Sequence, residues 1–277
     1  MTEAAQTGAL PLVFASALAF VRRELATYAS YRAKLALGLA SLLLSLVTFS
    51  FVGRVVAGAG TGFVERYGMS YTSFAVVGIF VHSLASSGLH SFRAAVRREQ
   101  LQGTLELLLT TRLPAPVLVL LAGIGDLVIT VVGGALLMAG AAALIGLDLR
   151  LSLPLVAALS LYLLVMCGVG LASAGVIMIS KEGEPLSWAV SGAAALLGGV
   201  YFPVDMLPDW LRAAAGALPT THALAVARCG AREAASQASG GSLLFLAAAA
   251  VVSLSAGLIV LEWGCCRARR AGTLAHY

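Results

Sequence analysis

The chain has 277 residues, of which 60% are hydrophobic and only 11% are charged. A soluble domain typically has ~25% charged and ~45–50% apolar residues, so this composition excludes an ordinary soluble protein and indicates a membrane protein. The net charge of +5 does not indicate nucleic-acid binding, because the arginines lie at the ends of apolar runs, where membrane topology explains them. Four cysteines without CxxC or Cys/His spacing indicate neither a disulfide framework nor a zinc site.

Six apolar stretches predict helices that cross a bilayer. A spanning helix needs ~20 mostly apolar residues, because the hydrocarbon core is ~30 Å thick and each residue rises ~1.5 Å. The expected spans are 34–53, 70–92, 115–145, 154–179, 186–202 and 241–263. The third is longer than necessary, and the fifth is short for a full crossing. The expected fold is therefore an all-α membrane protein with six transmembrane helices, in a single domain over residues 1–277.

The basic residues predict the orientation. If both termini are cytoplasmic, twelve of the 18 lysines and arginines fall on the inner side and six on the outer side. This excess favours cytoplasmic termini. Only two of the basic residues are lysines, which, together with the abundance of alanine and glycine, suggests a bacterial protein from a GC-rich genome.

Residues 12–32 predict a helix that lies in the membrane interface before the first span. Apolar patches alternate there with Arg22, Arg23 and Glu24, and Tyr28 provides an aromatic ring suited to the headgroup level. A simple N-terminal extension of the first span is the alternative.

Residues 93–112 predict a cytoplasmic amphipathic helix between the second and third spans. Leu101, Leu105 and Leu108 are spaced i, i+4 and i+7, so one face is apolar while the flanks carry charge. The segment is too long for a tight turn and too polar to span.

Residues 203–233 predict two short helices that dip into the outer leaflet and return. Three prolines divide this segment: Pro203, Pro208 and Pro219. Each piece has ~14 residues, or ~21 Å, so neither could cross alone. Thr220 can cap the second helix, and Trp210 suits a membrane-interface anchor. A plain surface loop is the alternative.

Asp126 is the only acidic residue expected deep in a span, where it should face protein or water. Counted from Arg93, His82 is ~16 Å deep, and counted from Pro114, Asp126 is ~18 Å deep. The two side chains could therefore be neighbours, with either a structural hydrogen bond or a role in substrate passage or gating. His90 is expected near the inner headgroups.

No motif for catalysis is found. Neither Lys34 nor Lys181 lies in a Gly-rich phosphate-binding loop, and the chain has no HExxH and no strand-to-helix GxSxG. These observations indicate a conduit rather than a catalyst.

Three stretches together resemble the membrane subunit of type-2 ATP-binding-cassette (ABC) exporters. They are Arg23-Glu24-Leu25 with Tyr31-Arg32; Glu99-x-x-x-Gly103-Thr104-Leu105-Glu106-x-Leu108-Leu109-x-Thr111; and Phe202-Pro203, Leu207-Pro208-x-Trp210-Leu211, Pro219-x-Thr221-His222 and Arg228. Their order around the expected spans makes the set specific, although each motif alone is weak.

The resemblance implies that the chain is half of a translocation pathway driven by separate ATPases. It implies partnership with two ABC ATPase subunits and a second permease half, most simply as a homodimer, in the bacterial cell membrane. ATP and Mg²⁺ would bind the ATPase, and this chain would bind no cofactor. The residues implied to contact the ATPase are Glu99, Gln102, Gly103, Thr104 and Glu106, and those implied to form an outer cap are Pro203, Pro208, Trp210, Pro219 and His222.

Two other classes of function remain open. A secondary transporter often has inverted repeats and several charges within the membrane, but no repeat and only one deep acid are found here. A membrane enzyme or an accessory subunit of an assembly is the other alternative. The sequence does not indicate a substrate.

Overall fold

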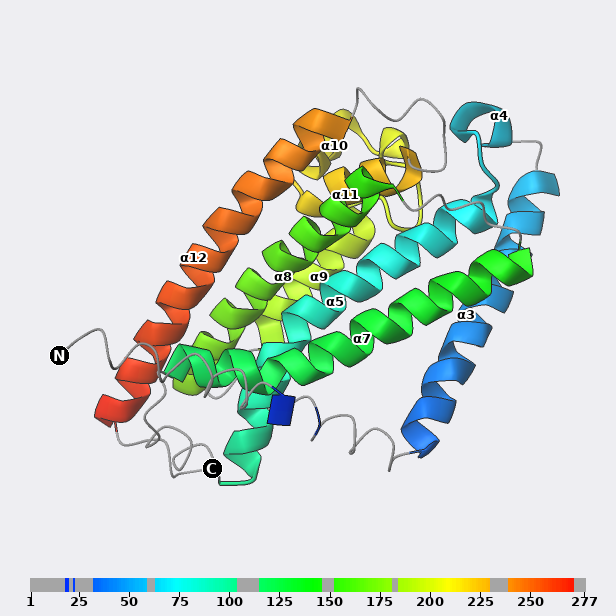
Figure 1. Ribbon diagram of the computed structural model, residues 1–277. Coiled ribbons are helices and arrows are strands. Elements are labelled where there is room, and N and C mark those ends of the chain that lie inside the picture. Colours follow the sequence, from blue (N-terminus) through cyan, green and yellow to red (C-terminus); the bar gives the residue numbers. More distant parts are fainter. Residues whose placement is uncertain are drawn as a thin grey trace.

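The protein is all helical in the part that the computed structural model describes (Figure 1). The described residues are 18–19, 22, 32–58, 63–103, 115–145, 152–180, 184–229 and 239–271. The helices are α3 (Arg32–Gly58), α4 (Phe63–Tyr67), α5 (Tyr71–Leu101), α7 (Ala115–Ile145), α8 (Leu153–Ser180), α9 (Glu184–Leu196), a 3-10 turn (Val204–Met206), α10 (Asp209–Gly216), α11 (Pro219–Cys229) and α12 (Ser239–Ala271). Most of the expected interface helix 12–32 lies outside the described residues.

Four helices are long and apolar enough to cross a membrane. Their spanning segments are Tyr71–Leu101 in α5, Pro116–Gly140 in α7, Leu153–Ile179 in α8 and Gly240–Ala268 in α12. These segments match the expected second, third, fourth and sixth spans. The expected first span lies in α3, a helix of 27 residues in which only Val47–Gly58 is identified as a short apolar segment, and the expected fifth span lies in α9, where Ser187–Leu196 is such a segment. Four of the six expected spans are therefore confirmed as helices that could cross a membrane.

The expected break between the second span and a cytoplasmic helix is absent at Arg93. Instead α5 is one helix of 31 residues that continues to Leu101. It ends where Gly103 adopts a φ of 68°, a left-handed conformation that glycine adopts without strain. The reason for the difference is physical: polar side chains mark where a helix leaves the bilayer, but they do not end its hydrogen-bonded backbone.

Three long helices form the centre of the bundle, because α8 packs along both α5 and α12. Gly168 and Gly175 of α8 face Gly257 and Gly264 of α12 so closely that a Cβ on any of them would overlap the backbone of the other helix. Small residues permit such close approach between membrane helices. The order of these contacts shows that α8 and α12 run in the same direction.

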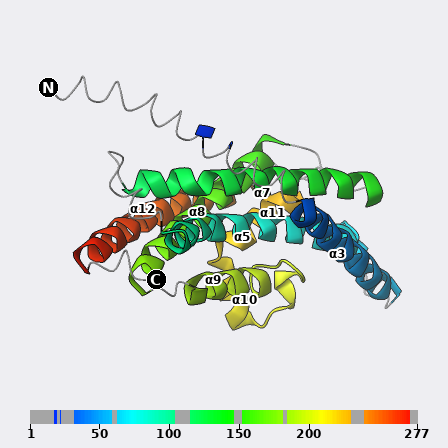
Figure 2. The same cartoon turned by 90° about the horizontal axis from the view of Figure 1, so that it is seen from below.

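The other neighbours of α5 complete the arrangement. Gly170 of α8 lies against the carbonyl group of Gly88, and Figure 1 shows that α5 and α8 begin at the same end of the bundle and run in the same direction. The next helix, α7, runs the opposite way along α5. Figure 2 shows α12, α8, α5 and α3 as a layer, with α7 on one side and α9 and α10 on the other.

The bundle has two different ends. We call the end where α5, α8 and α12 begin and where α10 and α11 lie the cap end (Figure 1). The end where α5 and α12 finish, with Arg93, Arg97 and Arg267, is called the basic end.

The short α9 is the main link by which the chain returns from the basic end to the cap end. The hydroxyl group of Ser187, near its start, donates to that of Ser173 in α8, 3.2 Å away. Val200, just beyond its end, lies against Gly78, only seven residues into α5. Because α9 covers only the middle of the bundle, the cap end is completed by α10 and α11.

Candidate functional site

One face of α5 has a row of polar side chains. His82, Ser86, His90, Arg93 and Arg97 are spaced i, i+4, i+8, i+11 and i+15, and all are half-buried. This spacing puts them on one side of a helix. The row, called here the α5 polar stripe, extends from the middle of a membrane-spanning helix to the basic end.

Part of the stripe is satisfied within α5 and part is not. Nδ1 of His90 lies 2.7 Å from the carbonyl oxygen of Ser86, a geometry in which the ring N–H donates. Nδ1 of His82 is buried without a hydrogen-bond partner among the described residues. A polar group inside a bilayer is costly unless it meets protein or water. His82 is therefore the member of the stripe that most needs water or further protein beside it.

Asp126 of α7, expected beside His82, is level with a different part of α5. Gly123 packs against Phe92, and Asp126 is three residues further along α7. Because the two helices run in opposite directions, Asp126 is about level with Leu89, seven residues or ~10 Å from the level of His82. The equal depths expected for the pair assume that α5 ends near residue 92, whereas it continues for about two more turns. A direct contact between Asp126 and His82 stays a prediction. The relative positions of the two helices do not favour it.

The residues expected to contact an ATPase have different environments at the end of α5. Gln102 and Gly103 are exposed in the turn that ends the helix, whereas Glu99 is only 5% exposed. Thr104 and Glu106 lie outside the described residues. A buried carboxylate is not available to a partner, so the exposed tip at Gln102 and Gly103 is the accessible part of this set.

The three prolines mark the starts of the short elements at the cap end, of which α10 and α11 together are called here the cap. Pro203 precedes the 3-10 turn, α10 begins directly after Pro208, and α11 begins at Pro219. Proline is favoured in the first turn of a helix, where its missing N–H would be unpaired anyway. Trp210, on α10, is 73% exposed, as a membrane-interface anchor requires.

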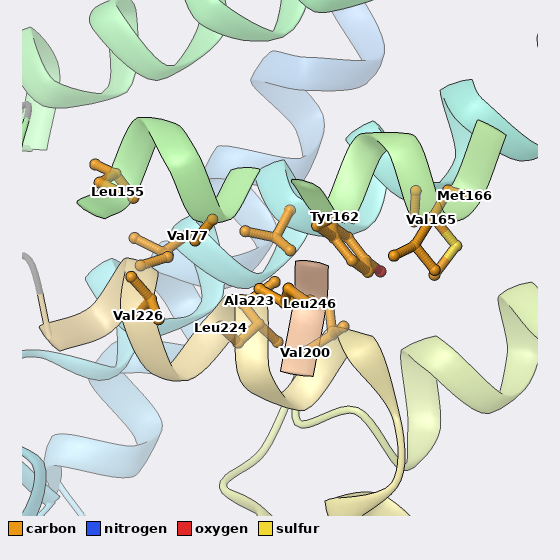
Figure 3. Packing of buried hydrophobic residues seen from close by; sticks show 14 of the residues in the cluster. Val77, Leu155, Tyr162, Val165, Met166, Val200, Ala223, Leu224, Val226 and Leu246 are labelled. Carbon is orange, nitrogen blue, oxygen red and sulfur yellow. The ribbon is translucent and has the colours of Figure 1, made fainter. Parts of the chain in front are cut away.

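Helix α11 is buried within the bundle. Ala223, Leu224 and Val226 belong to one core cluster with Tyr162 of α8 and Leu246 of α12 (Figure 3). A surface loop would not be expected to place a whole helix face in the core. The cap is therefore an integral part of the bundle.

A buried hydrogen bond holds the start of α11. The hydroxyl groups of Tyr162 and Thr220 are 2.9 Å apart, and both residues are fully buried. The expected role of Thr220 as a cap before the helix is wrong, because it lies in the first turn of α11 and its hydroxyl bonds to α8.

The bond also indicates how deep α11 reaches. Val226 lies toward Leu155, near the start of α8, while Thr220 bonds to Tyr162, seven residues or ~10 Å further in (Figure 3). Helix α11 therefore starts inside the bundle and runs back to the cap end.

His222 links α11 to both α10 and α12. Its Nε2 lies 2.9 Å from the carbonyl oxygen of Gly216, and its Nδ1 lies 3.3 Å from the hydroxyl oxygen of Ser242. The ring stacks on Phe245 with centroids 4.2 Å apart. One side chain thus connects the two cap helices to the start of the last span.

Arg228 attaches the other end of α11 to α5. Its Nη2 donates to the carbonyl oxygens of Phe74, at 3.2 Å, and Val200, at 3.3 Å. Its guanidinium lies over the ring of Phe74, a cation–π arrangement. A Cβ at Gly78 would lie 3.1 Å from Nη2 and overlap the carbonyl of Val200, so only glycine leaves room.

The charge of Arg228 is stabilised without an acidic partner among the described residues. Burial lowers its pKa to about 9, so the guanidinium remains protonated at neutral pH. The two carbonyl oxygens and the face of the Phe74 ring supply the partners of the charge.

The geometry above is that of a helical membrane protein whose two ends differ in structure and charge, and comparison with known families identifies it. Residues 16–230, more than half of the 277-residue chain, match the ABC-2 type transporter family. The chain belongs to this family. No curated protein matches the chain.

Family membership determines what kind of component this is. An ABC-2 permease is the membrane component of an ABC transporter, and no ATPase domain is found in this chain. It is a multi-pass membrane protein that works with ATPase subunits. The resemblance seen in the motifs is thereby confirmed.

Two contacts of the ABC-2 permease were not predictable from the sequence. Tyr162 lies within an apolar run that gives no sign of a partner 58 residues away. Phe74 likewise resembles any aromatic residue at the start of a span. Arg228 likewise gave no specific signal of burial, because Arg232 and Glu233 follow it closely in the sequence.

Proposed function

We propose that this permease is one half of an exporter in a bacterial cell membrane. A second copy of the chain supplies the other half, and each half engages one ABC ATPase, which binds the ATP and Mg²⁺. The basic end faces the cytoplasm and the cap end faces outward, with both termini inside. The distribution of the basic residues supports this orientation.

The observation that carries the proposal is the continuity of α5. One helix joins the contact of Phe74 with Arg228 in the cap to the exposed turn at Gln102 and Gly103. A helix of 31 residues is ~46 Å long, which exceeds the ~30 Å hydrocarbon core. A rigid rod of this length can transmit a displacement at the ATPase to the cap.

The segment 93–112 is the proposed docking surface for the ATPase. Its exposed part among the described residues is Gln102 and Gly103, and Thr104 and Glu106 are proposed to contact the ATPase from the segment that follows. Glu99 has a supporting role, because its burial suits it to hold the end of α5 against neighbouring residues rather than to contact a partner.

The α5 polar stripe is proposed to border the pathway between the two halves. Half-buried histidine and serine side chains inside a bilayer need water or protein beside them, and a pathway at a subunit interface provides both. Such a surface suits cargo with a polar part, which is consistent with an amphipathic substrate.

The outer helix pair, α10 and α11, is proposed to cap the exit of this pathway as a re-entrant structure. The depth of Thr220 and the exposure of Trp210 support this assignment. Pro203, Pro208 and Pro219 divide the segment, and His222 joins its two helices to α12.

The test is co-expression with a candidate ATPase, chosen for its phosphate-binding loop, followed by purification and measurement of ATP hydrolysis. The two proteins should copurify, and the permease should change the rate of hydrolysis. Gln102→Lys together with Glu106→Lys should abolish the change in rate. Asp209→Lys, an exposed charge change at the cap end, is the control and should leave both copurification and rate intact. If the double variant and Asp209→Lys had the same effect on copurification and on the rate of hydrolysis, the docking assignment would be overturned.

A further inference from the structure

The last three turns of α12 present a face that changes from apolar to aromatic to basic. Ile259, Trp263, Arg267 and Arg270 are spaced i, i+4, i+8 and i+11 and so share one side of the helix. Ile259 is 67% exposed and Trp263 is 55% exposed, and both arginines are exposed. In Figure 1 this end of α12 lies at the edge of the bundle.

The tryptophan and the first arginine are in contact on this face. Cζ of Arg267 lies 5.7 Å from the centroid of the Trp263 ring, within the range of a cation–π interaction. The ring therefore helps to orient the guanidinium, which leaves its donors available to an anion. Tryptophan at this position is also typical of the membrane interface.

The registers of the central helices place this face at the boundary of the bilayer. Gly88 of α5 packs at Gly170 of α8, and Gly168 of α8 packs at Gly257 of α12. Arg93 is five residues beyond Gly88, and Trp263 is six residues beyond Gly257, so the two lie at about the same level. Arg93 is therefore level with Trp263, and Arg97, one turn further on, is level with Arg267.

We infer that Trp263, Arg267 and Arg270 bind the phosphate-containing headgroup of an anionic phospholipid in the leaflet at the basic end. Arginine binds phosphate oxygens through pairs of parallel hydrogen bonds, and two arginines one turn apart can share one headgroup. The exposed apolar side chains earlier on the same face would contact the acyl chains.

A lipid fits this face better than an ATPase does. The arginines continue the line of Ile259 and Trp263, whose exposed apolar surface is what a bilayer covers. An acidic protein surface would instead be expected beyond the last turn, away from the apolar side chains. The lipid is therefore the occupant assigned here.

The experiment compares phosphatidylglycerol with phosphatidylcholine. The purified full-length protein is exchanged into mixed lipid–detergent micelles at graded salt, and the lipids retained are measured by native mass spectrometry. Wild type should retain phosphatidylglycerol preferentially. Each arginine near an anionic surface contributes about fivefold, so Arg267→Gln with Arg270→Gln should reduce the preference about 25-fold.

Arg54→Gln is the matched control, because Arg54 is also exposed and its Cζ lies 5.5 Å from the ring of Phe51, but on α3 and without a second arginine one turn on. This variant should keep most of the preference, and circular dichroism checks that all variants are folded. An unchanged preference in the double variant would overturn the inference. If that variant also failed to copurify with the ATPase, the face would be assigned to the ATPase instead.

Discussion

The guanidinium of Arg228 lies over the ring of Phe74, with Cζ 3.4 Å from the ring centroid. The same guanidinium donates to the carbonyl oxygens of Phe74 and Val200. One side chain of α11 thus contacts the first turn of α5 and the segment that follows α9. In the proposed mechanism this is the point at which movement of α5 reaches the cap.

Replacement of Arg228 by methionine should loosen the cap. The substitution retains an unbranched apolar side chain but leaves two carbonyl groups without their charged donor, at a cost of ~1–3 kcal/mol. Thermal unfolding in lipid nanodiscs should show a lower transition temperature. Phe74→Leu retains the hydrogen bonds but removes the cation–π contact, about 0.5–2 kcal/mol, and also the packing of the ring against Phe63, Tyr67 and Tyr71.

Arg212→Met is the control for this prediction. Arg212 donates to the carbonyl oxygens of Asp205 and Leu207, but at the exposed surface of the cap. Its loss should lower the transition temperature much less, because water replaces an exposed donor. Equal effects of Arg228→Met and Arg212→Met would show that Arg228 does not anchor the cap.

The buried pair of Tyr162 and Thr220 should show strong coupling. Tyr162→Phe removes one hydroxyl group and leaves that of Thr220 buried without a partner, at a cost of ~1–3 kcal/mol. Adding Thr220→Val removes the unpaired group, so the double variant should be more stable than the sum of the two single effects. Strictly additive shifts in the unfolding temperature would mean that the two hydroxyl groups do not interact.

Close packing of α8 on α12 predicts a sharp contrast between two glycines. A Cβ at Gly257 would overlap the carbonyl oxygen of Gly168, whereas at Gly133 of α7 nothing lies within 4 Å. Gly257→Ala should destabilise the protein by ~1–3 kcal/mol because the helices must move apart. Gly133→Ala should be neutral or slightly stabilising, and comparing the two by thermal unfolding separates packing from helix propensity.

Cysteine labelling tests the orientation. In a variant that lacks Cys229 and Cys266, a cysteine at the exposed position of Asp209 should react with a membrane-impermeant maleimide in intact cells. A cysteine that replaces Thr273 should react only after the cells are permeabilised. Labelling at position 273 from outside would contradict the proposed orientation.

The periodicity and the prolines predicted much of the architecture. Pro203, Pro208 and Pro219 act locally on the backbone, so the division of this segment into short helices follows from sequence alone, although the exact starts of α10 and α11 do not. Four apolar runs likewise predicted four long helices. These features depend on neighbouring residues and on hydropathy, which a sequence displays directly.

Features that depend on register were predicted less well. The polar residues from Arg93 onward indicated a new helix, yet α5 continues because nothing before Gly103 ends its backbone. The level of Asp126 depends on how α7 packs on α5 at Gly123, which no local pattern encodes. The burial of Glu99, a residue expected to contact the ATPase, depends on the same packing.

Site-specific photo-crosslinking tests the central claim most directly. A photoreactive amino acid is placed at Gln102, at the exposed tip of α5, and in a second variant at Trp210, on the exposed cap. Each is co-expressed with the ATPase in cells and irradiated. The account predicts a covalent product of permease and ATPase from position 102 and none from position 210. A product from position 210, or none from position 102 in a complex that still copurifies, would contradict it.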